Sequence, residues 1–302
     1  GWICPLGLLI DISRRLLGSG STKGGRDLRY IKYVLLIFLL MAACFGLPLA
    51  GYLDPFSLLV RGLTFAVQPG VDHAATSLFT WTYQQAPAWI NTLTEPVYGL
   101  LKQWVLPFST KVYALSGLSL LLLVAVLGLS RIERRLFCRA FCPLGALLGL
   151  TARFALLRLR GGAEACGRCD HCQTVCPMGA IDDKRVIATA ECTLCLDCLS
   201  QCPRQRIHYG LRSSRANEQA INLSRRTVLT SLTAGALAPL LLPTRPLARH
   251  PDPLLIRPPG AVAEAEFLAR CVRCGECMKV CIGNALHASW LEAGWEGIFT
   301  PR

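Results

Sequence analysis

Three stretches of the chain lack charged residues over about the thickness of a lipid bilayer. They cover residues 33–53, 112–130 and 227–244, and basic residues border each of them. A membrane-spanning helix needs about 17–25 predominantly apolar residues. The first two stretches therefore predict spanning helices. The third contains Pro239 and several threonines and is expected to be a signal or anchor helix. For each stretch the alternative is a helix buried in a protein core.

Lysines and arginines are distributed unevenly around these stretches. Three of them, Arg61, Lys102 and Lys111, lie between the first two stretches. Six precede the first stretch: Arg14, Arg15, Lys23, Arg26, Arg29 and Lys32. Because cytoplasmic loops carry the excess of Lys and Arg, the start of the chain and the region after 130 are expected in the cytoplasm. The predicted location is a bacterial inner membrane, with lipid as a partner.

The composition changes this picture little. The chain is 52% hydrophobic, carries a net charge of +13 and has a mean hydropathy of +0.41, which is high for a soluble protein. The arginines lie beside apolar stretches and no nucleic-acid-binding motif appears, so no nucleic-acid partner is expected. The sequence has no G-x-G-x-x-G, P-loop or C-x2-C-H motif, so nucleotide chemistry and c-type haem attachment lack a site.

Two cysteine runs in the middle of the chain share one spacing. Each reads C-x2-C-x2-C-x3-C-P, from Cys166 to Pro177 and from Cys192 to Pro203. In two-cluster ferredoxins the first three cysteines of such a run hold one [4Fe-4S] cluster and the fourth binds the other. The spacing therefore predicts two ligand sets, Cys166, Cys169, Cys172 and Cys202 for one cluster and Cys192, Cys195, Cys198 and Cys176 for the other.

Structural zinc binding and disulfide bonding are the two alternative roles for these cysteines. Structural zinc also takes four thiolates from C-x2-C pairs, but it has no need for a second copy that ends in proline at this spacing. A disulfide framework fits poorly because this chain is not a small secreted domain. We interpret Asp170 and His171, inside the first run, as spacers.

A second repeat has the sequence C-P-L-G. It begins at Cys4 and again at Cys142, and the later copy has Cys138 four residues upstream. The partner of Cys4 would fall just before Gly1, so we expect the chain to be a fragment. Cys4, Cys138 and Cys142 are expected at the cytoplasmic edge of the membrane. They are candidates for a metal or cluster site, a redox-active dithiol or buried structural cysteines.

A third run, Cys271, Cys274, Cys277 and Cys281, lies near the end of the chain, with Ile282 in place of the usual proline. It predicts a further cluster. No second run follows it, so a truncation is expected at this end too. We expect the charges beside the runs, Arg168, Arg273 and Lys279, to be solvated.

The segment before the third run suggests export. Ser224-Arg225-Arg226-Thr227-Val228-Leu229 resembles a twin-arginine signal, although phenylalanine is usual where Val228 stands. The alternative is an ordinary positive flank of a spanning helix. Both interpretations place residues 246–302 outside the cytoplasm.

The C-P-L-G repeats, the segment Leu53–Leu59 and the double run together resemble the membrane polyferredoxins related to NapH of periplasmic nitrate reductase and NosR of nitrous oxide respiration. The resemblance covers residues 1–210, and Arg257-Pro-Pro-Gly260 with the third run resembles the exported ferredoxin NapG. The resemblance to the membrane polyferredoxins implies electron transfer from quinol or a cytoplasmic donor toward a periplasmic or membrane reductase, with a quinone as a further cofactor. Related proteins handle copper, so an assembly factor that reduces copper or thiols is the alternative. A scaffold with structural clusters is a third.

The expected fold class is membrane α-helical with small α+β ferredoxin-like modules of the bacterial two-cluster type. Four domains are predicted: a membrane domain over 1–160, a cytoplasmic module with two clusters over 161–212, a signal or anchor helix over 213–245, and an exported ferredoxin-like segment over 246–302. Any catalysis is expected to be that of an electron-transfer component of a larger oxidoreductase system.

Overall fold

Two structural units each contain two separate segments of the chain. Unit 1 consists of Gly1–Ser57 and Val124–Leu247, and unit 2 consists of Leu58–Leu123 and Ala248–Arg302. The structure is a computed structural model, and it describes residues 4–18, 28–85, 87–104, 111–161, 169–183, 185–211, 223–241 and 255–302. Each unit is considered separately below.

Unit 1 is mainly helical and includes one pair of strands among its described residues. Its elements are α1 (Pro5–Leu17), α2 (Arg29–Cys44), α3 (Ala50–Leu53), the π-helix η2 (Phe137–Phe141), α8 (Pro143–Ala152), β1 (Leu157–Arg160), α9 (His171–Val175), the 3-10 helix η3 (Thr189–Glu191), α10 (Asp197–Ser200), β2 (His208–Leu211) and α11 (Arg225–Leu241). Helices α4 (Pro55–Gly62) and α7 (Ser116–Ile132) belong partly to each unit.

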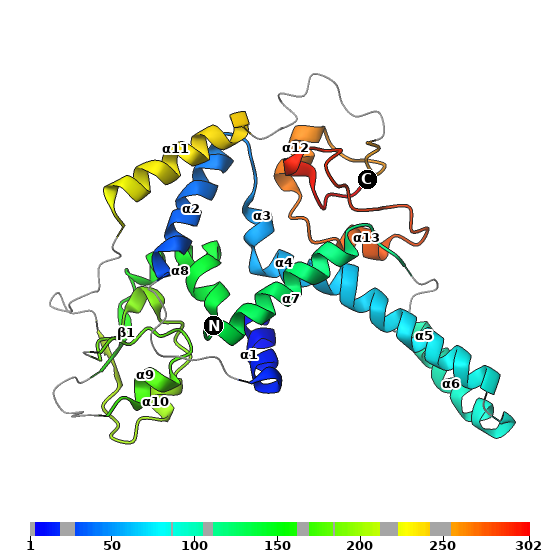
Figure 1. Ribbon diagram of the computed structural model, residues 1–302, viewed down its shortest axis with the longest axis horizontal. Helices are drawn as coiled ribbons and strands as arrows, with labels where there is room; N and C mark the ends of the chain where they lie inside the picture. Colours follow the sequence, from blue (N-terminus) through cyan, green and yellow to red (C-terminus); the bar gives the residue numbers. More distant parts are fainter. Residues whose placement is uncertain are drawn as a thin grey trace. The chain divides into compact units, whose positions relative to one another are not determined.

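Helix α11 packs along α2, as Figure 1 shows. Ala42 and Leu47 are buried against Ala238 of α11. The two helices approach closely at Gly235, where an added Cβ atom would lie 2.7 Å from the carbonyl oxygen of Phe38. Glycine at this position therefore sets the distance between the helices.

Helix α8 covers another part of α2. Tyr33 and Leu36 of α2 are buried with Ala146 of α8. On α8, Gly149 lies against the η3 turn, because a Cβ atom there would lie 2.5 Å from the carbonyl oxygen of Ala190. This contact brings the helices against the loop that carries the second cysteine run.

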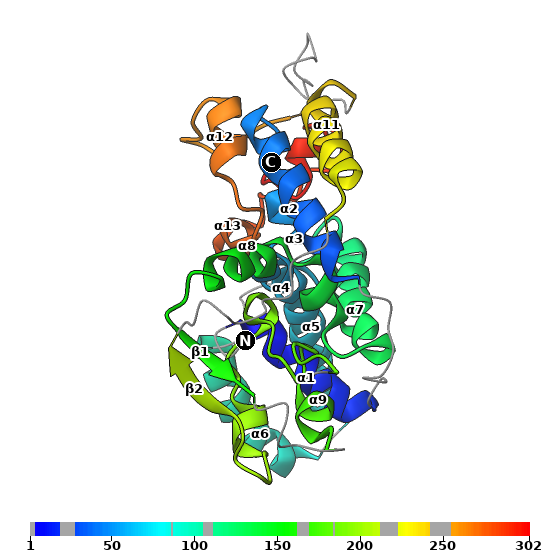
Figure 2. The ribbon, with the colours of Figure 1, turned by 90° about the vertical axis from the view of Figure 1, so that its left-hand side faces the viewer.

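Strands β1 and β2 enclose both central cysteine runs in the sequence. They pair antiparallel, with Leu157 opposite Leu211 and Arg160 opposite His208, and Figure 2 shows them side by side. Between them the chain forms only short helices and an isolated bridge from Ile181 to Ile187 among the described residues. The small core consists of Leu159, Ile181, Cys198 and Ile207. We call residues 157–211 the cysteine module.

Unit 2 is built around aromatic residues. The ring of Phe65 lies 5.2 Å from that of Tyr113 and 6.2 Å from that of Phe299, measured between centroids. Buried Arg61 stacks on Phe299. Its elements are the π-helix η1 (Leu63–Val67), α5 (Gln68–Gln85), α6 (Ala88–Trp104), α12 (Glu264–Arg270), α13 (Glu276–Val280) and the 3-10 helix η4 (Trp295–Gly297).

The expected membrane α-helical class is wrong. No helix within the described ranges combines the length and the apolar character that crossing a bilayer requires. The stretch 33–53 is divided, because α2 ends at Cys44, Gly46 takes a positive φ of 85° and Pro48 follows. The stretch 112–130 becomes helical only at Ser116, after Leu115 with a φ of 67°.

The third stretch, residues 227–244, also differs from the uninterrupted apolar helix that the sequence suggested. Helix α11 begins with Arg225 and Arg226 and contains Pro239 near its end. Helices α2, α7 and α11 have 16, 17 and 17 residues. At about 1.5 Å per residue they extend about 24–26 Å, less than the roughly 30 Å hydrocarbon core of a bilayer. The described fold is helical with a small two-stranded sheet.

Candidate iron–sulfur centres

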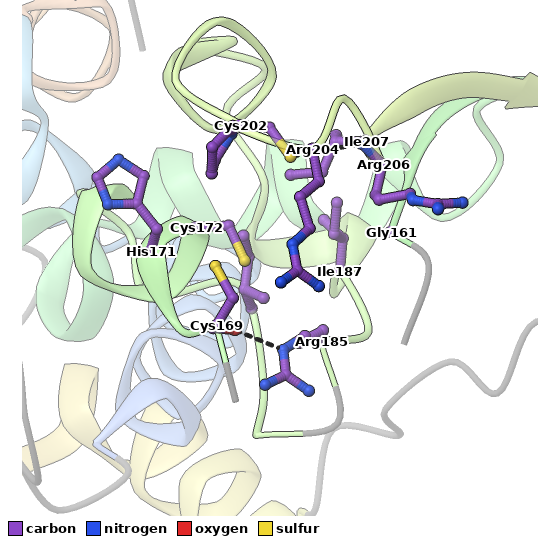
Figure 3. Close-up of a pocket in the computed structure, with 12 residues that line it drawn as sticks. Gly161, Cys169, His171, Cys172, Arg185, Ile187, Cys202, Arg204, Arg206 and Ile207 are labelled. Carbon is purple, nitrogen blue, oxygen red and sulfur yellow. Dashed lines mark hydrogen bonds between the residues drawn. The ribbon is translucent and has the colours of Figure 1, made fainter. Parts of the chain in front are cut away.

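Three of the four cysteines predicted for the first cluster line one pocket. Cys169 precedes α9, Cys172 lies in its first turn and Cys202 follows α10, and all three face the pocket in Figure 3. Cys166, the fourth predicted ligand, lies outside the described residues. The imidazole of His171 points away from the three sulfur atoms, as expected for a spacer.

Basic side chains surround this pocket. Arg185 Nε donates a hydrogen bond of 2.8 Å to the carbonyl oxygen of Cys169, and Arg204 and Arg206 also line the pocket. Burial raises the pKa of the Cys202 thiol, but the backbone N–H groups that follow it, those of Arg206 and Arg204 above all, outweigh burial and lower that pKa overall. A thiolate is therefore favoured where a cluster ligand is predicted.

The second predicted set is complete in the described residues, and its thiols lie together. Burial and then the neighbouring thiols of Cys176, Cys192 and Cys195 together raise the pKa of Cys198 to about 12. The pKa values of Cys192 and Cys195 are also raised, first by burial and then by neighbours that include Cys176. Four thiols with no disulfide between them thus share one small volume.

The second and third runs wind through the same backbone conformation although they belong to different units. In the second run Leu194 and Leu196 have φ values of 51° and 67°. At the equivalent positions of the third run, Arg273 and Gly275 have φ values of 58° and 84°. Successive turns of this kind direct backbone N–H groups into a concavity that suits anions and iron–sulfur clusters.

The third run brings three cysteines together and leaves the fourth apart. Burial raises the pKa of Cys277, and the thiols of Cys271 and Cys274 raise it as well. The thiol of Cys281 instead lies near the N–H groups of Ala285 and Leu286, which lower its pKa.

Arg273 of this run was expected to be solvated, and that expectation is wrong. Its side chain is 2% exposed, and it donates a hydrogen bond of 2.7 Å to the carbonyl oxygen of Glu296. Lys279 is partly exposed and lies near Glu276, and Arg168 falls outside the described residues.

The C-P-L-G cysteines form a separate group in unit 1. Cys4 and Cys142 each precede a helix, α1 and α8, with proline at its first position. The Sγ atom of Cys142 accepts a hydrogen bond of 3.3 Å from the N–H of Gly145. Burial and then the thiols of Cys142 and Cys4 together raise the pKa of Cys138 to about 12. The two copies of the repeat are thus brought together.

A buried polar group beside the second run was not predicted. Lys32 Nζ lies 2.5 Å from Glu191 Oε2, and the hydroxyl of Tyr33 donates a hydrogen bond of 3.1 Å to Glu191 Oε1. Lys32 and Glu191 are 1% and 7% exposed. The sequence shows Lys32 only as one more basic residue before an apolar stretch, and nothing in it pairs Lys32 with Glu191.

The donor set suits iron–sulfur clusters. Thiolates on tight loops, with nearby backbone N–H groups and apolar side chains, are what such clusters need. Within the described ranges no three Cys, His, Asp or Glu side chains converge on a point that a single metal ion could occupy.

Comparison with known proteins supports this chemistry. Residues 1–23 and 113–161 match a family described as a 4Fe-4S binding domain, and these segments contain both C-P-L-G copies. YccM of Escherichia coli, named for electron transport, is 34% identical over 124 residues, 40% of this chain and 34% of YccM. The ferredoxin-type protein NapH of Haemophilus influenzae is 24% identical over 232 residues, 72% of this chain and 63% of NapH.

The regulatory protein NosR of Pseudomonas aeruginosa is 38% identical over 76 residues, 25% of this chain and 11% of NosR. These matches confirm the predicted resemblance to the NapH/NosR-like 4Fe-4S polyferredoxins. The chain spans about a third of the length of YccM and less than two thirds of that of NapH. No solved structure matches it.

Proposed function

We propose that this chain is an iron–sulfur electron-transfer protein that carries electrons from quinol or a cytoplasmic donor toward a periplasmic or membrane reductase. The observation that carries the proposal is the gathering of Cys176, Cys192, Cys195 and Cys198 in one small volume. The names of the relatives, which describe electron transport and ferredoxin-type proteins, support the same role. Because no single chain in these comparisons is matched over its full length, donor and acceptor are part of the proposal.

The chain itself would hold the clusters in place and supply the charged groups around them. When bound, [4Fe-4S] clusters take up and release single electrons. The cysteines of the central runs would hold two clusters and those of the third run at least one more. The basic residues around the first pocket, Arg185, Arg204 and Arg206, would favour the more negative, reduced state. The quinone and the cellular location stay predictions.

Anaerobic purification tests the proposal directly. We expect a coloured protein that contains iron and acid-labile sulfide, shows a paramagnetic signal on reduction and titrates reversibly. Mixing the reduced chain with a candidate acceptor should re-oxidise it. A colourless protein that contains zinc instead of iron and gives no signal on reduction would refute the proposal and favour structural zinc sites.

A second candidate function is the reduction of copper or thiols during assembly of an oxidase or reductase. The observation that favours it is the separate group of Cys4, Cys138 and Cys142, of which Cys142 is buried. A Cys138→Ser variant separates the two functions. If electron transfer to the acceptor persists while copper delivery to the partner fails, assembly is the function. If both persist, the group of three thiols has a structural role.

A further inference from the structure

Unit 1 contains a basic cavity that the cysteine sets do not use. Its volume is about 510 Å³, within the roughly 300–1,000 Å³ that small-molecule sites occupy. Four arginines line it, Arg14 and Arg15 from α1 and Arg134 and Arg135 from the segment that follows α7. Thr174 and Gln201, from the ends of α9 and α10, complete the polar part of the wall.

Two carboxylates also line the cavity, but both have other partners. The carboxylate of Asp11 is held by Arg135 through two hydrogen bonds, one of them 3.1 Å from Arg135 Nε to Asp11 Oδ1. The side chain of Asp197 interacts with the thiol of Cys195. Asp197 keeps its negative charge in this contact, so four guanidinium groups and two carboxylates line the cavity.

Arg14, Arg15 and Arg134 line the same cavity, where the lining residues include one carboxylate, Asp197, besides the Asp11 that Arg135 holds. Burial lowers the pKa of Arg134, and the positive charge of Arg14 lowers it further. Arg134 Nη1 donates to the carbonyl oxygen of Thr174 at 2.5 Å, while its Nε is buried without a hydrogen-bond partner in the described part of the chain. A guanidinium group that is buried beside like charges is stabilised by an anion with several oxygen acceptors.

The cavity adjoins an apolar surface and lies near two thiol groups. A neighbouring cavity of about 230 Å³, also lined by Asp11, Arg15 and Arg135, adds Leu8, Ile12 and Cys195. The thiols of Cys138 and Cys195 both favour the charged form of Arg135. This arginine therefore lies near the C-P-L-G group and near the second cysteine run. A ligand bound in this cavity would extend toward the C-P-L-G group and toward the second cysteine run.

We infer that the cavity bounded by Arg14, Arg15 and Arg134 binds a small molecule that carries a phosphate or carboxylate group, with its anionic end on the guanidinium groups and its apolar part toward Leu8 and Ile12. The size of the cavity favours a small molecule over a protein segment. The inference goes beyond electron transfer, because binding can be measured whether or not electrons move.

Calorimetry on the full cluster-loaded chain tests it, with pyrophosphate and citrate as separate probes. We expect saturable one-site binding of at least one probe at 0.15 M salt. Because each charge-assisted hydrogen bond contributes about a tenfold change in affinity or more, Arg14→Gln should weaken binding by about tenfold. Pyrophosphate binding without citrate binding would identify phosphate as the recognised group, and the reverse would identify carboxylate.

Two further variants complete the design. Arg131→Gln is the matched control, because Arg131 is exposed in the last turn of α7 and does not line the cavity. Arg134→Lys keeps the charge and removes the planar guanidinium, so it should weaken binding even if Arg14→Gln fails to fold. The inference is overturned if neither probe binds, if Arg14→Gln binds as the unaltered chain does, or if Arg131→Gln weakens binding equally. It is also overturned if only an acidic peptide binds.

Discussion

At the scale of single residues, the contact of Lys32 with Glu191 is the clearest determinant of stability in unit 1. Both side chains are almost fully buried, and Tyr33 adds a hydrogen bond to the same carboxylate. Removing one partner of a buried ion pair leaves the other charge without compensation, at a cost of about 3–5 kcal/mol. The pair also ties α2 to the residue that precedes Cys192.

We predict that Lys32→Met lowers the free energy of unfolding by about 3–5 kcal/mol, measured by urea denaturation of the cluster-loaded chain. The double variant Lys32→Met with Glu191→Gln should recover part of the loss, because no unpaired charge then remains buried. Arg131→Met, at an exposed position, is the control and should change stability little. Equal losses in the single and double variants would contradict the role of the pair.

At the scale of elements, the contact of α8 with the η3 turn depends on Gly149. A Cβ atom there would lie 2.5 Å from the carbonyl oxygen of Ala190 and 3.0 Å from the hydroxyl of Tyr33. The backbone of Ala190 cannot move without displacing the loop that leads to Cys192. The contact thus limits how far the cysteine module can shift against the helices of the same unit.

We predict that Gly149→Ala destabilises the chain by about 1–3 kcal/mol through overpacking. Gly128→Ala is a matched control, because Gly128 lies inside α7 with nothing within 4 Å of the added atom. Alanine there should stabilise the helix by about 0.5–1 kcal/mol. Thermal denaturation of the two variants should give shifts of opposite sign, and shifts of the same sign would show that the contact at Gly149 is not tight.

The sequence predicted helix lengths poorly, whereas its cysteine ligand sets stay predictions. Spacing alone groups Cys169 with Cys172 and Cys202, and these three line one pocket. Helix length cannot be taken from hydropathy in the same way, because apolar stretches such as 33–53 are interrupted by local backbone geometry at Gly46 and Pro48. The burial of Arg273 also escaped prediction, and the residue takes a positive φ that its residue type does not favour.

At the scale of the whole molecule, the cysteine module has too little core to be stable alone. Its helices α9 and α10 have five and four residues, and its core contains Leu159, Ile181 and Ile207 beside a cysteine. Small domains of this kind are usually held by metal binding, so that removal of the metal unfolds them. The helices α2 and α11 pack on each other without using the cysteine runs.

We predict that iron chelation under anaerobic conditions exposes the amides of residues 169–211 to hydrogen exchange, while those of α2 and α11 stay protected. Mass spectrometry of peptides from both regions measures the difference. A chain treated with the same chelator already saturated with iron is the control. Protection of both regions after iron has left would show that the module folds without its clusters.

The pairing of β1 with β2 has a further consequence. Because Leu157 lies opposite Leu211, the polypeptide enters and leaves the module at neighbouring points. A short linker could therefore join the two ends of the module. Another domain whose ends lie equally close together could replace it with little rearrangement of the rest of the unit. Residues 157–211 should therefore fold with their clusters when inserted as one piece into an unrelated protein.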